Sequence, residues 1–335
     1  MQYEDRVFGV HTIEEPIILE LLETKAMQRL RGIDQSGYPH PFFPELVPHS
    51  RFEHSVGVYL LLKKYNASLY EQISGLLHDL SHTVFSHCGD YLLGDCDAQK
   101  EQTHHDLFFS SFLLQTDVPR VLEKYGFSAE DFFDDTNFPL REKLLPDLCA
   151  DRIDYALRTA VSSNKWDGER VQSTLSRLQV EENQWIFSDL EAAREYGQLF
   201  AEMNTNYYTH FLSVVMHYAV TECLRYCLEQ SYIRYDDLYT TDAEVLDKVK
   251  RYLDDPRLVI LFARMHDATC AVHDPDQFHE KIFCKSRVVD PLCYHRGEVV
   301  RLSFCDPSWE RFVREERHPK VYSLRFVESV GLSRM

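Results

Sequence analysis

The stretch GLLHDLSHTVFSHCGD, residues 75–90, places three histidines and two aspartates directly behind a short apolar run. The apolar spacing of residues 70–85 predicts a buried helix. Such a helix often carries one histidine, whose ring nitrogens find hydrogen bonds. Three imidazoles beside two carboxylates exceed that need, and the stretch is therefore a candidate metal site.

Two residues of this stretch are candidate metal ligands. His78 and Asp79 are adjacent on the predicted helix, so their side chains leave it about 100° apart and can straddle one ion. A third candidate, His54, lies on the preceding predicted helix, and a fourth, Asp151, lies in ADRIDY on a later one. Two imidazoles and two carboxylates suit Mn²⁺, Fe²⁺, Zn²⁺, Ni²⁺ or Mg²⁺, with open positions for water and substrate.

The remaining polar groups suggest acid–base chemistry. We expect His82 on the same helical face as His78, with His87 and Asp90 three residues apart on the following turn or loop. His105 lies further along, in QTHHDLFF. Beside a metal ion that polarises a phosphoryl oxygen, such histidines can protonate a leaving group, and a carboxylate can orient an imidazole.

Composition is that of a soluble globular chain. The 335 residues are 44% hydrophobic and 27% charged, which disfavours disorder. Nine cysteines without a C-x-x-C pair favour reduced thiols, and hence the cytoplasm. We expect no membrane segment, because no secretory signal or sufficiently long apolar run is present.

The net charge is strongly negative. A formal charge of −18 repels polyanions at long range, which argues against bulk nucleic-acid binding. A small anionic substrate remains compatible with this charge, because it needs only a local basic cluster or a metal ion.

Helical patterns dominate the chain, so we predict a mostly α fold. Helices are expected over residues 14–37, 51–65, 70–85, 140–163 and, as one or two elements, 194–230. Small β hairpins are expected in the C-terminal half, over residues 179–188 and 287–304. We predict a catalytic core over residues 1–165, with a helical extension over residues 166–335 packed on it as one unit.

The order of RFEHS, GLLHDLSHTVFSH, HHD and ADRIDY resembles the HD-domain phosphohydrolase superfamily. QRLRGIDQSG, which precedes them, is similar to the deoxynucleoside triphosphate triphosphohydrolase branch. The resemblance covers roughly residues 4–160. It implies an HD-domain helical core, a nucleotide substrate and a homo-oligomer.

The resemblance also implies roles for individual residues. The implied metal ligands are His54, His78, Asp79 and Asp151. The implied catalytic residues are His87, Asp90 and His105. The implied substrate contacts are Gln35, Arg51, His82, Arg152 and Tyr155. At position 152 the family carries lysine, so arginine keeps the charge but changes its geometry.

Two positions depart from the family pattern. Thr159 stands where the triphosphohydrolases carry an aspartate that binds the sugar 3′-hydroxyl. Phe200 stands where the alignment places an arginine that clamps the triphosphate. The usual triphosphate contacts are thus altered or supplied elsewhere.

Several functions stay open at this point. The leading hypothesis is release of triphosphate from a deoxynucleoside triphosphate. A nucleoside monophosphate phosphatase or cyclic-nucleotide phosphodiesterase is the first alternative. A di-iron oxygenase would need more histidine ligands, and besides the histidines near the HD pair only His104 or His105 lies in the expected interval. A non-catalytic, nucleotide-binding regulatory subunit is the last.

Overall fold

The computed structural model describes residues 1–93 and 104–327; the side chain of His104 lies outside what it describes. The described part is mostly helical, which confirms the predicted fold class. Its α-helices are α1 (Pro16–Leu22), α2 (Lys25–Arg29), α3 (Arg51–Lys64), α4 (Leu69–Leu77), α5 (Cys88–Leu93), α7 (His104–Leu113), α8 (Val118–Lys124), α9 (Ala150–Ser162), α10 (Gly168–Ser176), α11 (Leu190–Met203), α12 (Phe211–Glu229), α13 (Asp242–Val249), α14 (Pro256–Arg264), α15 (Leu302–Cys305) and α16 (Pro307–Glu316). Shorter 3₁₀ turns are η1 (Leu30–Gly32), η2 (Ala129–Phe132), η3 (Asp135–Asn137), η5 (Tyr235–Tyr239) and η6 (Lys250–Tyr252), and η4 (Asn204–Tyr208) is a π-helical turn.

Small sheets complete the described fold. Strands β1 (Gln2–Asp5) and β2 (Gly9–Thr12) form a hairpin. A second sheet has the order β3 (Leu178–Glu181), β4 (Gln184–Phe187), β7 (Leu292–His295) and β8 (Glu298–Arg301), and a third has the order β5 (Ala271–His273), β9 (Lys320–Phe326) and β6 (Glu280–Cys284). The pairs β3–β4 and β7–β8 are the two predicted hairpins, joined by parallel pairing of β4 with β7.

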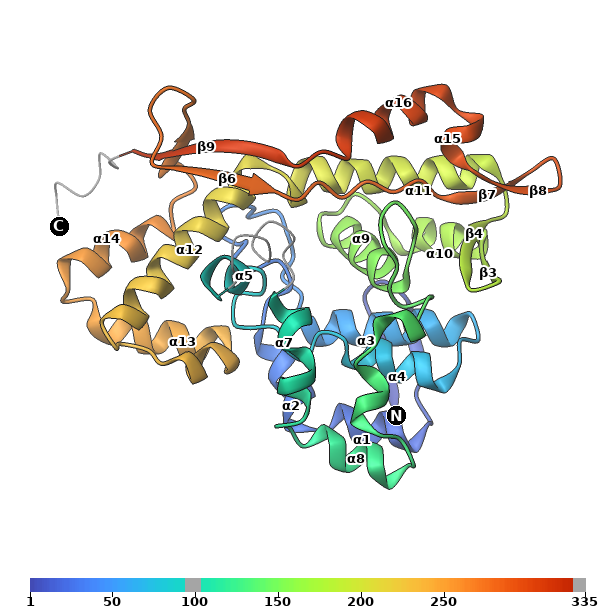
Figure 1. The fold of residues 1–335 in the computed structure, drawn as a ribbon, viewed down its shortest axis with the longest axis horizontal. Coiled ribbons are helices and arrows are strands. Elements are labelled where there is room, and N and C mark those ends of the chain that lie inside the picture. Colours follow the sequence, from blue (N-terminus) through green and yellow to red (C-terminus); the bar gives the residue numbers. More distant parts are fainter. Residues whose placement is uncertain (94–103, 328–335) are drawn as a thin grey trace.

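Helix α3 lies at the centre of the helical core, between α4 and α9 (Figure 1). It begins at a capping box, in which Ser50 accepts from the Glu53 amide while Glu53 accepts from the Ser50 amide. Gly57 lets α9 approach closely, because a Cβ there would lie 2.0 Å from Oδ1 of Asp154. This packing places residues of α3 and α9 side by side at the site.

Three predicted helices are shorter in the structure. The predicted helix over residues 70–85 ends at Leu77, and Phe85 and Ser86 have positive φ angles of 55° and 50° that no α-helix allows. The helix predicted from residue 14 breaks after α1, where Thr24 caps α2. The helix predicted from residue 140 begins only at Ala150, after a loop that contains Pro146.

Buried apolar residues form two clusters in the described part. The larger cluster extends from Val7 to Leu324 and draws on both halves of the chain. The smaller one packs Val84, Phe85 and Cys88 against α12, α13 and α14, which gather at one end of the molecule (Figure 1). The predicted division near residue 165 stays a prediction.

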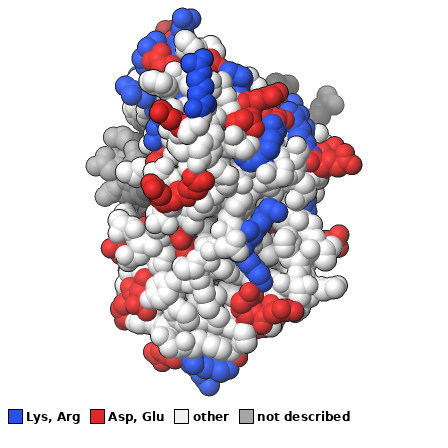
Figure 2. Space-filling model, turned by 90° about the vertical axis from the view of Figure 1, so that its right-hand side faces the viewer, with Lys and Arg blue, Asp and Glu red and all other residues white. Residues whose placement is uncertain are grey.

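The described surface mixes both signs of charge. On the face drawn in Figure 2, acidic and basic side chains alternate in small groups and form no continuous basic track. Within residues 1–93 and 104–327, no helix has the length and apolarity needed to cross a membrane. The described cysteines are free thiols and all but Cys305 are buried, as the sequence predicts.

Candidate metal centre and active site

The four predicted ligands meet at one point, although they come from three elements. His54 lies in the first turn of α3, His78 and Asp79 directly follow α4, and Asp151 lies in the first turn of α9. Nε2 of His54 lies 2.9 Å from Oδ1 of Asp151 and 3.2 Å from Nε2 of His78. Nε2 of His78 lies 3.4 Å from Oδ1 of Asp79 and 3.6 Å from Oδ1 of Asp151.

These separations fit one divalent ion. Metal–ligand bonds of about 2.1 Å at octahedral or tetrahedral angles place neighbouring ligand atoms about 3.0–3.4 Å apart. The His54–Asp151 and His78–Asp151 separations of 2.9 and 3.6 Å lie close to this range. His78, Asp79 and Asp151 also line a large cavity, so an ion held here would face it. The donor set suits Mn²⁺, Fe²⁺, Zn²⁺, Ni²⁺ or Mg²⁺ and does not choose among them.

The other nitrogen of each histidine ligand is already occupied. Nδ1 of His54 lies 2.7 Å from Oδ2 of the buried Asp154, and Nδ1 of His78 lies 2.8 Å from the Gly75 carbonyl oxygen. Both Nε2 atoms therefore point toward the centre, as metal-ligating imidazoles do when an outer partner fixes the ring.

The carboxylates of the centre favour a positive charge beside them. Burial alone would lower the pKa of His54, but hydrogen bonds with Asp151 and Asp154 outweigh it and raise that pKa to about 9. At neutral pH a proton on His54 thus partly balances the carboxylates. A divalent cation would occupy the same place and displace that proton.

Arg51, a predicted substrate contact, is tied into the protein. Nη1 donates to Oδ2 of Asp79 at 2.7 Å, Nε donates to the Ser86 hydroxyl at 2.9 Å, and Nη2 donates to the Gln35 carbonyl oxygen at 3.3 Å. Its positive charge helps to hold the pKa of the Asp79 carboxyl well below its usual range, against the effect of burial. Arg51 lines the cavity and connects three of the segments that form it.

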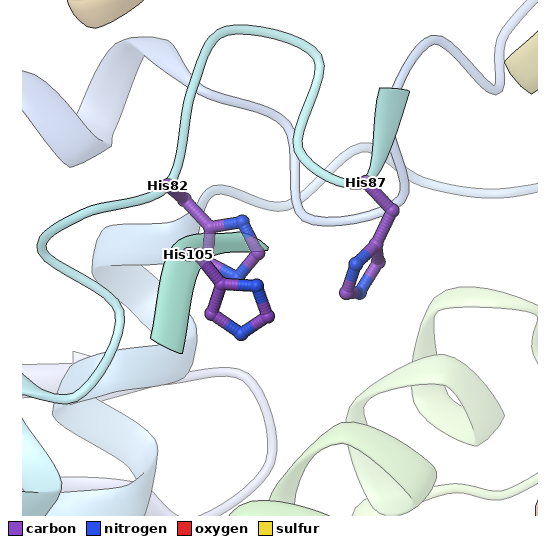
Figure 3. A group of neighbouring side chains, drawn as sticks. All are labelled: His82, His87 and His105. Atoms are coloured by element: carbon purple, nitrogen blue, oxygen red, sulfur yellow. The ribbon is translucent and has the colours of Figure 1, made fainter. Parts of the chain in front are cut away.

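The predicted acid–base residues form a second group beside the metal centre. The rings of His82 and His105 stack with centroids 3.8 Å apart, and His87 faces them edge-on (Figure 3). Asp90 lies between two of them, with Oδ2 at 2.8 Å from Nδ1 of His87 and Oδ1 at 3.6 Å from Nδ1 of His105. Nε2 of His82 lies 3.3 Å from Oδ1 of Asp79, although the helix predicted through His82 ends at Leu77.

The three histidine rings could in principle hold a metal ion, because their nitrogens lie within 4.8 Å of one another. Stacked rings, however, direct their nitrogen lone pairs side by side, whereas ligands of one ion must converge on it. The geometry of His82 and His105 therefore suits phosphate contact and proton transfer better than metal binding.

His87 and His105 have different pKa values because their surroundings differ. Burial lowers the pKa of His87 to about 4, despite its bond with Asp90. Burial also opposes a charge on His105, but Asp106 and Asp90 raise its pKa to about 9. At neutral pH His105 is protonated and His87 is neutral, which is the separation expected of an acid and a base.

A cavity of about 660 Å³ opens over both groups. All five predicted substrate contacts line it: Gln35, Arg51, His82, Arg152 and Tyr155. Within the described residues Oε1 of Gln35 is buried without a hydrogen-bond partner, so it is an acceptor available to a ligand.

Several hydrogen bonds to the protein hold the Arg152 guanidinium, for which a substrate contact is predicted. Nη1 donates to the Asp147 carbonyl oxygen at 2.7 Å, and Nη2 donates to the Lys143 carbonyl oxygen at 3.0 Å and to Glu142 at 3.3 Å. These bonds fix the loop between η3 and α9 that borders the cavity. The guanidinium thus has a structural task beside any contact with phosphate.

Thr159 and Phe200, the two positions that depart from the family pattern, lie close to Tyr155. The Tyr208 hydroxyl donates to Oγ1 of Thr159 at 3.1 Å, and the Tyr155 and Tyr208 rings meet edge-on with centroids 5.4 Å apart. Phe200 is fully buried and packs against Tyr155 and Tyr208, so its side chain belongs to the core beneath the cavity.

Other cavity residues did not emerge from the sequence. Lys285 and Arg287 line the cavity from the segment after β6, and His217 lines it from α12. The only available signal was the alternation of basic residues in KSR, residues 285–287.

The chain is similar to several known proteins. The chain matches the HD domain family over residues 51–155. It is 31% identical to the uncharacterized protein YdhJ of Bacillus subtilis (strain 168) over 310 residues, which cover 90% of this chain and 91% of that protein. It is 30% identical to the metal-dependent phosphohydrolase cns2 of Cordyceps militaris over 315 residues, 91% of this chain and 89% of that protein.

Two more distant proteins are also similar to this chain. A deoxynucleoside triphosphate triphosphohydrolase SAMHD1 homolog of Dictyostelium discoideum is 24% identical over 72% of this chain and 49% of its own length. The crystal structure of a hypothetical protein from Aquifex aeolicus shares the fold, with a TM-score of 0.72 at 20% identity over 98% of this chain and 96% of that chain.

Fold and centre together define a helical protein with a candidate histidine–aspartate metal site. The chain belongs to the HD-domain family and is a metal-dependent phosphohydrolase.

Proposed function

We propose that this chain hydrolyses nucleotides, and that its principal reaction releases triphosphate from a deoxynucleoside triphosphate. The observation that carries the proposal is the convergence of His54, His78, Asp79 and Asp151 beside the His87–Asp90–His105 group, in one cavity of about 660 Å³. Similarity to a relative named as a deoxynucleoside triphosphate triphosphohydrolase supports the substrate class.

The metal ligands would be His54, His78, Asp79 and Asp151. When bound, a divalent ion polarises a phosphoryl oxygen and increases the acidity of water. Arg51 keeps Asp79 charged and fixed, and Asp154 fixes the ring of His54. The chain thereby presents a rigid set of ligands, as metal-assisted hydrolysis requires.

Proton transfer is assigned to the second group. Nδ1 of His87 donates to Asp90, so the neutral ring offers Nε2 as an acceptor for a proton from the attacking water. His105 carries a proton at neutral pH and can donate it to the leaving oxygen. Asp90 contacts both rings and balances their charge.

The proposed reaction consumes one water molecule for each nucleotide. Water attacks the α-phosphorus, the bond from this phosphorus to the sugar O5′ breaks, and O5′ takes up a proton. The products are a deoxynucleoside and inorganic triphosphate. Gln35, with its buried acceptor, and Tyr155 would contact the sugar, while His82 would contact a phosphate oxygen.

Hydrolysis of a nucleoside monophosphate is a second candidate function. It is favoured by the buried Phe200, which contributes no charge, and by the bonds that occupy Arg152. A monophosphate needs fewer cationic contacts than a triphosphate.

Product identification distinguishes the two. The chain is incubated with Mn²⁺ and deoxynucleoside triphosphates, monophosphates or cyclic nucleotides, and the released phosphates are separated by ion chromatography. Triphosphate with free deoxynucleoside is the expected product, and orthophosphate from monophosphates alone would support the second candidate.

Controls for this assay are available in the chain. Asp79→Ala should reduce turnover by about a thousandfold or more, because the ligand set is broken. Asp274→Ala, at a half-buried ion pair with Arg325 outside the cavity, should leave turnover unchanged. If wild-type chain released no phosphate from any nucleotide, a non-catalytic binding function would replace the proposal. The homo-oligomer and the cytoplasmic location stay predictions.

A further inference from the structure

Two cationic residues reach the cavity from the C-terminal half of the chain. Lys285 and Arg287 follow β6 and both line the cavity, while Ser286 between them is buried. Alternate residues of an extended segment point to the same side, which explains why residues 285 and 287 share the cavity. Neither position belongs to the motifs of residues 4–160.

The segment is held in place by one buried amide. Oδ1 of Asn204 accepts from the backbone N–H of Arg287 at 3.0 Å, and its Nδ2 donates to the Ser286 hydroxyl at 3.3 Å. Asn204 is 1% exposed and begins the π-helical turn η4. Such turns are costly interruptions that occur frequently at functional sites.

The same turn carries aromatic walls of the cavity. Tyr207 and Tyr208 belong to η4 and line the cavity, and Tyr208 contacts both Tyr155 and Thr159. One short π-helical element therefore positions the aromatic walls and the basic segment together.

The charge of Arg287 reaches the acid–base group. Burial is the main reason that the pKa of His87 is low, and the positive charge of Arg287 lowers it further. Arg287 also opposes the rise that burial causes in the pKa of Tyr155 and Tyr208. Arg287 thus lies on the side of the cavity where His87, Tyr155 and Tyr208 meet.

Three further arginines, Arg51, Arg141 and Arg152, line the cavity together with Lys285 and Arg287. Arg51 binds Asp79, Arg152 binds Glu142 and two carbonyl oxygens, and Arg141 binds Asp135. A chain of −18 net charge needs local cations to hold a polyphosphate, and the position matched to the family's clamp is the apolar Phe200.

We propose that Lys285 and Arg287 bind the phosphates beyond the one that reacts, so that the preferred substrates are nucleotides carrying a di- or triphosphate. The inference rests on the proposed nucleotide site and deepens it. Arginine and lysine supply charge-assisted hydrogen bonds to phosphate oxygens, with bidentate geometry for arginine. Asn204 is the positioning residue that holds this pair over the cavity.

Binding of inorganic phosphates tests the inference directly. The affinities of the Mn²⁺-loaded chain for inorganic triphosphate and for orthophosphate are measured by titration calorimetry. Arg287→Ala should weaken triphosphate binding by about 10- to 100-fold, the range expected for a lost charged hydrogen bond, and change orthophosphate binding by less than about threefold. Arg287→Lys should restore part of the loss.

Matched variants separate this effect from damage to the fold. Lys281→Ala, in strand β6 just before the basic segment and exposed over the Phe278 ring, should leave both affinities unchanged. If Arg287→Ala did not fold, Lys285→Ala would provide the same comparison. Equal affinities of the wild type and of both cavity variants for triphosphate would overturn the inference.

Turnover distinguishes this inference from the proposed function. If the wild type hydrolyses nucleotides while Arg287→Ala lowers kcat/KM equally for tri- and monophosphates, the inference fails and the proposed function stands. If no nucleotide is hydrolysed but triphosphate binding depends on Arg287, the proposed function fails and the polyphosphate contact stands.

Discussion

Asp154 accepts a hydrogen bond from Nδ1 of His54 at 2.7 Å, and both side chains are fully buried. The same carboxylate binds Arg158, which also binds Asp5. This buried network lies behind the metal centre and determines which nitrogen of His54 faces the ion. It links the N-terminal hairpin to the chemistry of the site.

Asp154→Asn should lower the affinity for Mn²⁺ by about 10- to 100-fold, the usual cost of losing an outer partner of a histidine ligand. Titration calorimetry with Mn²⁺ measures the change. Asp274→Asn, at the half-buried pair with Arg325, serves as the control and should bind Mn²⁺ normally. Unchanged affinity in Asp154→Asn would show that this hydrogen bond does not orient the ligand.

Metal binding should release protons. The pKa of His54 is raised to about 9, so below that value the ion must displace a proton. Apparent Mn²⁺ affinity should therefore rise with pH up to about 9 and level off above it. Calorimetry in buffers of different ionisation enthalpy counts the protons released, and a pH-independent affinity without proton release would contradict this assignment.

The pH dependence of turnover should reflect the acid–base pair. His105 keeps its proton up to about pH 9 and His87 stays neutral down to about pH 4, so kcat/KM should be highest between these limits. His105→Gln should remove the alkaline limb and lower the plateau by about 100-fold or more. An unaltered alkaline limb in this variant would assign that limb to another group.

Gly57→Ala should destabilise the fold. A Cβ at this position would lie 2.0 Å from Oδ1 of Asp154 and 2.1 Å from Nη2 of Arg158, and overpacking of this kind costs about 1–3 kcal/mol or more. Denaturant unfolding measures the loss. Gly168→Ala is a matched control in open space at the start of α10, and it should not lower the free energy of unfolding.

Asp242 should control catalysis from outside the cavity. Its carboxylate accepts from the backbone N–H of Phe85 at 2.7 Å and of Asp34 at 2.8 Å, and so joins the loop after His82 to the loop of Gln35. Asp242→Ala removes the acceptor of both amides, and kcat should fall about tenfold while Mn²⁺ is retained.

Asp247→Ala, on the exposed side of the same helix, is the control for this variant and should leave kcat unchanged. Wild-type kcat in Asp242→Ala would mean that the two loops keep their geometry without this anchor.

The four candidate ligands can be picked out from the sequence because each lies within or directly after a short helical segment, and their binding of a metal ion stays a prediction. His54 and Asp151 lie in the first turns of α3 and α9, where helical patterns are strong. The two C-terminal hairpins are also predicted, because alternating residues flank a turn.

The features of the fold and site that the sequence does not predict depend on contacts between distant segments. The helix predicted through His82 ends at Leu77, because Phe85 and Ser86 adopt left-handed backbone angles that Asp242, far along the chain, helps to hold. Arg287 reaches the cavity through its bond with Asn204, and no local pattern encodes that pairing.

The most direct test of the metal centre is the anomalous difference map of a crystal soaked in Mn²⁺. We expect one strong peak, within about 2.0–2.3 Å of Nε2 of His54, Nε2 of His78 and a carboxylate oxygen each of Asp79 and Asp151. A crystal that binds Mn²⁺ only elsewhere, or a peak centred among His82, His87 and His105, would contradict it.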